Sequence, residues 1–224
     1  MGRKALDKPR ILNPDVRQDF IQRLIPFFME RGFSNTKMED IARYLGVSKA
    51  TLYEHFSSQE ELYSLAVDYV LQEIRASRSI LEKKELSYAE RYVYLFAVVL
   101  QQVAGITPLF VQDIEENYPQ LWQRVQDFYQ SWEKDLQNFY EEGRAAGTFI
   151  EIHPAVFSRT IIAMLKEMIN SEFLITHALT LPQLLLDFFK IHSQGVFQKT
   201  EKIWDLEKLA LSLLQKIFSQ EGSS

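Results

Sequence analysis

The chain has 224 residues, of which 46% are hydrophobic and 25% charged, and its formal net charge is −5 at pH 7. A chain of this length and composition forms one or two globular domains with a sizeable core. It contains no cysteine, which excludes disulfides, thiolate nucleophiles and cysteine metal sites. No apolar run approaches the roughly 18 residues of a membrane span, and the charged start MGRKALDKPR lacks the apolar core of a signal peptide. We therefore expect a cytoplasmic protein with no membrane partner.

Helical periodicity runs through the whole sequence, without a long alternating strand pattern, an internal repeat or a low-complexity segment. An all-α fold is therefore expected. The first helix is predicted to begin at Asn13-Pro14, where a capping residue precedes a proline, and to end at Gly32. Pro26 lies inside this helix, removes one backbone hydrogen bond and is expected to kink the helix.

Two short helices follow, separated by a tight turn. Residues 36–39, Thr-x-x-Glu, have the form of a capping box and are predicted to open a helix that ends at Gly46. Ser48 is predicted to cap the next helix, which reaches about Phe56. Helices of two turns are unstable alone in water, so packing against longer neighbours must hold them. Two short helices joined by a glycine-containing turn form the helix-turn-helix pattern.

The two short helices have one apolar face and one polar face. The positions expected to face a common core are Ile41, Ala42, Leu45, Leu52 and Phe56. The outward face of the second short helix then shows Lys49, Ala50, Thr51, Tyr53, Glu54 and His55. A cation near the helix start, a small methyl group and hydroxyl donors suit the major groove of DNA. The alternative is a solvated polar face without a partner, and the pattern favours DNA binding over it.

Longer helices fill the rest of the chain. They are predicted over about 59–82, opened by a second capping box at Ser58-x-x-Glu61, and over 88–104, 108–118, 119–143, 155–176, 182–197 and 201–219. The helices at 155–176 and 182–197 are apolar on more than one face, so each is expected to be buried on two sides. One side would pack on the subunit's own core and the other on a symmetry mate, or both would lie inside a monomer. The candidate dimer residues are Ile162, Leu165, Ile169, Leu185, Phe188 and Phe189.

Aromatic residues concentrate between residues 88 and 140, where they are expected to line an apolar cavity together with two methionines. The candidate cavity residues are Phe96, Phe110, Trp122, Phe128, Trp132, Met164 and Met168. Plain core packing explains each single residue equally well. No cluster of arginine or lysine indicates an anionic ligand, so we expect an effector that is largely apolar or aromatic, or else cationic because Asp113 and Glu115 lie nearby.

The four histidines are scattered, and neither a His-Glu-x-x-His motif nor a glycine-rich phosphate loop occurs. The sequence therefore offers no constellation for metal or nucleophilic catalysis, and we expect no cofactor.

The stretch GFSNTKMEDIARYLGVSKATLYEHFSSQEEL, residues 32–62, resembles the N-terminal DNA-binding domain of the tetracycline-repressor (TetR) family of bacterial transcription regulators. The resemblance implies an N-terminal helix-turn-helix domain over 14–74, with the motif itself at about 37–56, and a helical domain over 75–224 for ligand binding and dimerisation. It also implies a homodimer on a near-palindromic operator of double-stranded DNA. Carried over to this chain, phosphates or adjacent bases would be contacted by Thr36, Lys37, Thr51, Tyr53 and His55. Ser48 would contact the backbone, while Lys49 and Ala50 would meet base edges.

The chain departs from the family pattern at a few positions. Gln59 stands where the family usually has a lysine, so one phosphate contact is expected to be missing. Glu54 replaces a common aromatic residue, and Arg23-Leu24 replaces a pair of small residues. The function implied is a repressor released by a small effector. Two alternatives remain: a helical small-molecule-binding protein or enzyme with an incidental helix-turn-helix, and a regulator released by a protein partner.

Overall fold

The computed structural model describes residues 14–103, 105–168, 171–198 and 203–221. Its described elements are one short 3₁₀ segment, η1 (Ser77–Ile80), and the α-helices α1 (Pro14–Arg31), α2 (Met38–Leu45), α3 (Lys49–His55), α4 (Gln59–Ala76), α5 (Tyr88–Val103), α6 (Pro108–Asn117), α7 (Pro119–Ala145), α8 (Pro154–Met168), α9 (Ser171–Thr176), α10 (Leu181–Val196) and α11 (Ile203–Glu221). The expected all-α fold is confirmed. In this part of the chain, the strand-like pairing amounts to one isolated bridge between Phe149 and Phe197, and no helix is long and apolar enough to cross a membrane.

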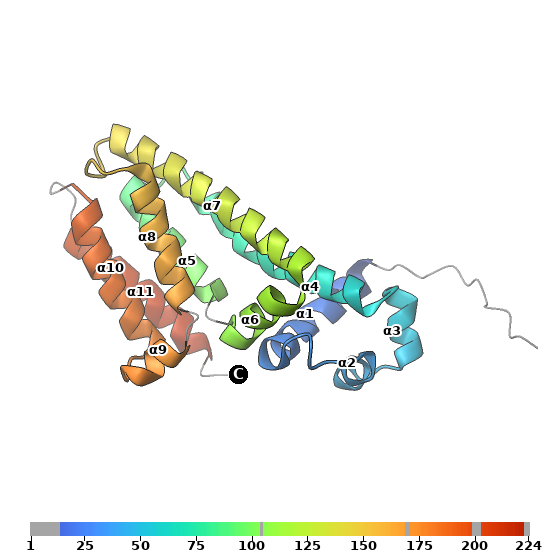
Figure 1. Ribbon diagram of the computed structural model, residues 1–224. Coiled ribbons are helices and arrows are strands. Elements are labelled where there is room, and N and C mark those ends of the chain that lie inside the picture. Colours follow the sequence, from blue (N-terminus) through green and yellow to red (C-terminus); the bar gives the residue numbers. More distant parts are fainter. Residues whose placement is uncertain (1–13, 104, 169–170, 199–202, 222–224) are drawn as a thin grey trace, which may run out of the picture.

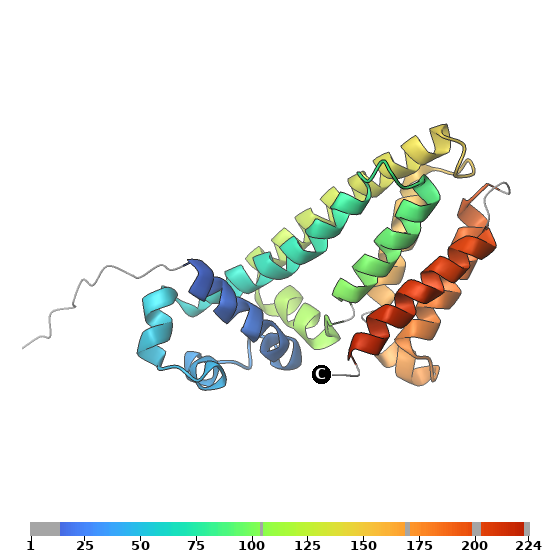
Figure 2. The same ribbon diagram turned by 180° about the vertical axis from the view of Figure 1, so that it is seen from behind.

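The helices form a small unit and a larger one, joined by α4 (Figure 1). Helices α1, α2 and α3 gather with the start of α4 at one end of the molecule. Helix α4 then runs beside α7, and α6 lies between α1 and α7. At the other end α8 and α10 pack together, and Figure 2 shows α11 lying along α5 on the opposite side.

The small unit is held by apolar side chains from all four of its helices. The side chains of Leu24, Phe28, Ile41, Leu52 and Phe56 are each 0% exposed, which confirms the inward face predicted for the two short helices. The turn between those helices depends on Gly46, whose φ of 72° is left-handed. Glycine adopts that conformation without the steric cost of a Cβ, so α2 can stop and the chain can turn into α3.

Several helix ends differ from the predicted ones. The capping box predicted at 36–39 is wrong, because the N-cap residue of α2 is Lys37 and not Thr36. The backbone N–H of Lys37 donates a 3.3 Å hydrogen bond to the Asp40 carboxylate. The single helix expected over 155–176 is described as two, α8 and α9. Asn13, the cap expected for α1, lies outside the described residues. Pro26 does lie within α1, and the kink expected there stays a prediction.

Candidate nucleic-acid interface and effector cavity

The polar face predicted on α3 is present and open to solvent. Lys37, Ser48, Lys49, Ala50 and Tyr53 are all exposed. Ser48 caps α3 as predicted, since its Oγ accepts a 3.0 Å hydrogen bond from the Thr51 N–H. The two hydroxyl oxygens of Ser48 and Thr51 lie 2.8 Å apart and share one hydrogen bond, so one of the two O–H groups stays free to donate to a phosphate.

Lys49 already has a partner on this face. Its ammonium forms an ion pair with the Glu39 carboxylate from α2, and it lies 5.9 Å from the centre of the Tyr53 ring. The hydrogen bond from Lys49 lowers the pKa of Glu39, and the same bond raises the pKa of Lys49. Exposed ion pairs contribute little stability. Glu39 therefore positions Lys49 at the start of α3, and the ion pair is weak enough for DNA to replace Glu39 as the partner of Lys49. Sequence reasoning missed Glu39, because it lies ten residues before its partner.

Thr36 is not part of this face. Its side chain is only 3% exposed, and its hydroxyl donates a 2.8 Å bond to the Phe33 carbonyl and lies 2.7 Å from the Tyr63 hydroxyl. The predicted contact between the Thr36 side chain and DNA is therefore wrong for this conformation, since the hydroxyl is engaged inside the subunit. Gln59 joins the same network by donating a 2.7 Å bond to the Thr36 carbonyl. The residue that replaces the family's lysine thus ties the start of α4 to the loop before α2.

His55 lies at the edge of the interface. Its ring packs edge-on against Phe20 with 5.5 Å between the ring centres. Its Nδ1 atom is buried and has no hydrogen-bond partner in the described part of the chain. Only the Nε2 side of the ring is then available for DNA. The unusual Arg23 has a structural use as well, because its guanidinium donates a 3.0 Å bond to the Leu45 carbonyl at the end of α2.

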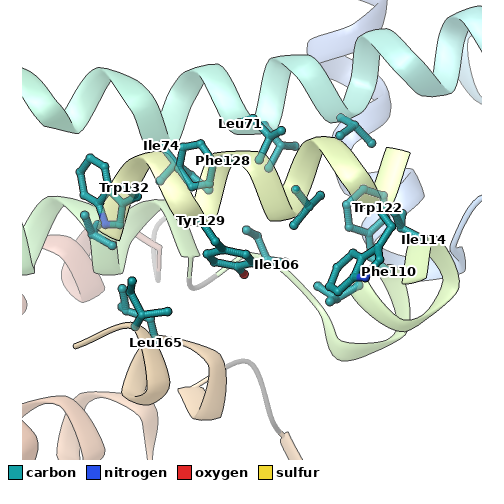
Figure 3. Close-up of a pocket in the computed structure, with 16 residues that line it drawn as sticks. Leu71, Ile74, Ile106, Phe110, Ile114, Trp122, Phe128, Tyr129, Trp132 and Leu165 are labelled. Atoms are coloured by element: carbon teal, nitrogen blue, oxygen red, sulfur yellow. The ribbon is translucent and has the colours of Figure 1, made fainter. Parts of the chain in front are cut away.

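A cavity of about 70 Å³ lies behind the small unit, between α4, α6, α7 and α8 (Figure 3). Four of the predicted cavity residues line it: Phe110, Trp122, Phe128 and Trp132. The sequence did not indicate Val67 and Leu71 of α4 or Tyr129 of α7, which line it too. Tyr129 could have been found from the helical spacing of Trp122, Val125 and Tyr129 on one face of α7.

Two predicted cavity residues do not line it. Phe96 packs instead between α5 and α10, where its ring stacks on Phe188 at 5.8 Å and contacts Phe189 at 5.5 Å. Met164 is half-buried and lies outside the lining. The side chain of Met168 lies outside the described part of the structure.

The candidate dimer residues also change roles. Ile162 and Leu165 line the cavity, and Leu185 and Phe189 are 0% exposed within the single subunit. A side chain already buried in its own subunit has no surface left to give to a partner. The assignments of Ile162, Leu185 and Phe189 are therefore corrected, because the inner faces of α8 and α10 had been taken for the outer ones, whereas Leu165 is half-buried and its assignment stays a prediction. Phe188 is half-buried, and Ile169 lies outside the described residues.

Asp113 faces the small unit and is not among the residues that line the cavity. Its Oδ2 atom accepts hydrogen bonds from the backbone N–H groups of Phe33 at 2.5 Å and Ser34 at 2.9 Å. Burial opposes the ionisation of Asp113, but the hydrogen bonds from Ser34 and Phe33 outweigh it and lower the pKa. Gly32 makes this approach possible, since a Cβ there would lie 2.8 Å from Oδ2. The carboxylate thus fastens α6 to the loop between α1 and α2 and is not free to bind a cationic ligand.

Part of the chain matches a known family model, and longer stretches of it resemble known regulators. Residues 27–66 match the family model of bacterial regulatory proteins of the tetR family. The IcaR protein of Staphylococcus aureus, an HTH-type negative transcriptional regulator of the biofilm operon icaADBC, is 28% identical over 136 residues, covering 58% of this chain and 72% of that protein. The HTH-type transcriptional regulator YvaF of Bacillus subtilis is 22% identical over 168 residues, covering 75% and 88%.

Solved structures share the fold. A regulator from Saccharomonospora viridis in complex with choline has a TM-score of 0.70 at 17% identity, covering 84% of this chain and 100% of that one. A TetR regulator from Chloroflexus aurantiacus has a TM-score of 0.66 at 19% identity, covering 82% and 97%. Residues 27–66 therefore carry the helix-turn-helix of the tetR family, with the capped helix α3 exposed, and the chain is similar to DNA-binding transcriptional regulators of that family.

Proposed function

We propose that this regulator is a repressor that binds a near-palindromic operator as a homodimer and is released by a small effector in the α4–α8 cavity. Residues 14–74 would form the DNA-binding domain and residues 75–224 the regulatory and dimerisation domain. The observation that carries the proposal is the open face of α3, where Lys49 and Tyr53 stand exposed beside the Ser48 cap. Repression is supported by the similarity to IcaR, a negative regulator.

The outer faces of α8 and α10 support a dimer. Val156 on α8 is 53% exposed and Ile191 on α10 is 75% exposed. The two helices are joined by a 3.1 Å hydrogen bond between Thr160 Oγ1 and His192 Nε2. Val156 lies one helical turn before Thr160, and Ile191 directly precedes His192, so both exposed residues lie near this hydrogen bond. Two adjacent helices with exposed apolar residues form an isologous four-helix contact when a second copy packs on them.

The cavity is placed to act on the DNA-binding end. Pockets for drug-sized ligands measure roughly 300–1,000 Å³, whereas this cavity measures about 70 Å³. A bound effector must therefore push its walls apart. One wall is α4, which begins in the small unit, and another is α6, which Asp113 ties to the loop before α2. Movement of either helix would change the position of α3 relative to its symmetry mate.

Repression by this route has a thermodynamic requirement. An effector shifts the equilibrium only by its difference in affinity for the two conformations, and near-complete release needs roughly 5 kcal/mol. The effector must then bind operator-bound protein more weakly than free protein, by the same factor by which it weakens DNA binding.

The direct test is binding of the purified full-length protein to duplexes from the region upstream of its own gene. We expect one fragment to bind more tightly than a shuffled duplex of equal length, with an affinity that falls as salt rises because phosphate contacts release counterions. Lys134→Ala, on the exposed side of α7, serves as the control for loss of a positive charge. Absence of binding to any duplex at low salt would contradict the proposal.

A further inference from the structure

The inner cavity is apolar on every side. Apart from the hydroxyl of Tyr129 and the indole N–H groups of Trp122 and Trp132, its lining consists of aliphatic and phenyl side chains. Such a surface gains free energy by covering the apolar body of a ligand, and the Tyr129 hydroxyl is the one side-chain group among these lining residues that can accept a hydrogen bond.

An outer groove of about 380 Å³ lies against the inner cavity, and the two share Val111, Trp122 and Tyr129 as walls. In contrast to the cavity, the groove is lined by the polar side chains of Gln112, Glu115, Gln126 and Lys166. Since the same three side chains face both spaces, a shift of Tyr129 would join them into one site with an apolar inner end and a polar outer end.

Two hydrogen-bond donors meet at this boundary, and neither is bonded to an acceptor among the described residues. Lys166 Nζ lies 4.8 Å from the centre of the Tyr129 ring. Within the described part of the chain, Lys166 makes no ion pair within 4.0 Å, so the carboxylate of Glu115 in the same groove does not neutralise it. The Tyr129 hydroxyl makes no hydrogen bond to any described residue. Burial raises the pKa of Tyr129, which keeps the phenol protonated and therefore a donor.

The charges around the cavity disfavour a cation inside it. Arg75 lies over the Phe128 ring at 5.7 Å, and Arg78, which is paired with Asp135, lies over the Trp132 ring at 5.4 Å. With Lys166 on Tyr129, three of the rings that line the cavity already have a protein cation as partner. A quaternary ammonium ligand would need such ring faces for itself and would meet the repulsion of these charges.

From these observations we infer that the effector is an amphipathic molecule with an apolar body and a single anionic headgroup of the carboxylate kind. This inference rests on the proposed function, since it names the ligand class of the proposed effector site. The apolar body occupies the inner cavity. The headgroup lies in the outer groove, where it accepts a hydrogen bond from Tyr129 and pairs with Lys166. The inference replaces the cationic ligand that the sequence suggested.

The test uses three probes with the same alkyl chain and different headgroups: decanoate, decanol and decyltrimethylammonium. Each is titrated into the full-length protein below the concentration at which it forms micelles, and binding is followed by calorimetry and by the fluorescence of Trp122 and Trp132. Hydrogen bonds to charged groups contribute roughly 1.5–3 kcal/mol, so we expect decanoate to bind at least about tenfold more tightly than decanol, and decyltrimethylammonium to bind most weakly.

Variants at the boundary identify the residues responsible. Lys166→Met is expected to weaken decanoate binding about tenfold while leaving decanol binding unchanged, and Lys166→Arg to preserve both. Tyr129→Phe is expected to weaken decanoate binding without loss of the folded state, because only a hydroxyl is removed. Lys134→Met removes the same charge from an exposed site on α7 outside the groove and serves as the matched control.

The inference is overturned if no probe binds, if the ammonium probe binds as tightly as decanoate, or if Lys166→Met behaves like Lys134→Met. The proposed function is tested separately, by measuring operator affinity in the presence of decanoate. If decanoate binds tightly and through Lys166 but leaves operator affinity unchanged, the headgroup assignment is supported and release from DNA by this ligand is contradicted.

Discussion

Lys49 and Tyr53 stand side by side on α3, but their chemistry assigns them different tasks. Lys49 projects from the first position of the helix, where α3 would enter the major groove, and a lysine that reads a base edge contributes about 1–3 kcal/mol of discrimination. We expect Lys49→Ala to lose that amount for the operator and to relax specificity at one position per half-site. Tyr53→Phe removes only a hydroxyl proposed to bind phosphate, so it should weaken all duplexes similarly.

The measurement is fluorescence anisotropy with the operator and a shuffled duplex at the same salt concentration. Lys134→Ala controls for the loss of charge. The assignment of roles is wrong if both variants lose operator and shuffled binding in the same proportion.

His192 makes stability depend on pH. It is 8% exposed, and its Nδ1 lies 2.5 Å from the Tyr92 hydroxyl. Burial lowers the pKa of His192 from 6.5 to about 4. As the pH falls below 6.5, His192 therefore becomes protonated in the unfolded chain but stays neutral in the folded protein. The stability present above pH 6.5 is thus progressively lost down to about pH 4.

Between pH 7 and pH 5 we expect the wild type to lose about 2 kcal/mol more free energy of unfolding than His192→Gln. Urea denaturation at fixed protein concentration measures both. Glu61 does not affect stability between pH 7 and pH 5. Burial opposes its ionisation, but hydrogen bonds from Ser57 and the Arg17 guanidinium lower its pKa to about 2. Its contribution to the free energy of unfolding is therefore lost only as the pH falls below about 4.5. Equal slopes for wild type and variant would contradict the role of His192.

Single residues also show where sequence reasoning is sufficient. Ser48 caps α3 and Gly46 ends α2 as predicted, because capping and left-handed turns are local and depend on neighbours in the chain. Thr36 was misjudged because its partner, the Tyr63 hydroxyl, meets it only after α1 and α4 have packed. A threonine before a helix looks the same in sequence whether it faces phosphate or the core.

Among the elements, α6 is the short helix that contacts both the cavity and the loop between α1 and α2. Phe110 and Ile114 line the cavity, and Asp113, next to Ile114 in the same helix, accepts hydrogen bonds from the N–H groups of Phe33 and Ser34. Asp113→Ala would remove both bonds while leaving the cavity unchanged. We expect it to cost about 1–3 kcal/mol of stability and to reduce the factor by which an effector weakens operator binding.

That factor is the ratio of operator affinities with and without decanoate, or any other ligand that releases the wild type. Asp127→Ala removes a carboxylate that accepts only from Gln123 on the surface of α7 and is the control. If the effector weakens operator binding by Asp113→Ala as much as it weakens binding by the wild type, then the hydrogen bonds between α6 and the loop before α2 do not transmit the effect of the ligand.

The elements show the limit of sequence reasoning most clearly in α8 and α10. Their apolar residues on several sides correctly indicated burial, but periodicity cannot tell which side meets the cavity, the core or a second subunit. Ile162 and Leu165 face α4 and α7 across the cavity, and Leu185 is enclosed by its own subunit. The outward Val156 stands beside the buried Phe157, and the outward Ile191 stands between Lys190 and His192, so neither residue was recognisable as outward-facing from the sequence.

In the whole molecule, the reading helix α3 and the exposed faces of α8 and α10 lie at opposite ends, joined by α4 and α7 (Figure 1). A dimer that reads two half-sites in successive major grooves must place its two recognition helices about 34–36 Å apart. A contact made at the far end would leave both α3 helices free and would set their spacing through the long helices. Small changes beneath α4 would then be transmitted to the spacing of the recognition helices.

The dimer is tested by placing charge on the exposed positions. We expect the double variant Val156→Glu, Ile191→Glu to remain folded, because both side chains are exposed in the single subunit, and to sediment as a monomer with greatly weakened operator binding. Leu109→Glu places a charge on an exposed apolar position of α6 and should stay dimeric.

Leu185→Glu should instead unfold the protein, because that side chain is 0% exposed and a buried unpaired charge is strongly destabilising. Circular dichroism separates loss of fold from loss of association. A double variant that remains a dimer, or a wild type that sediments as a monomer, would show that the second subunit does not pack on α8 and α10.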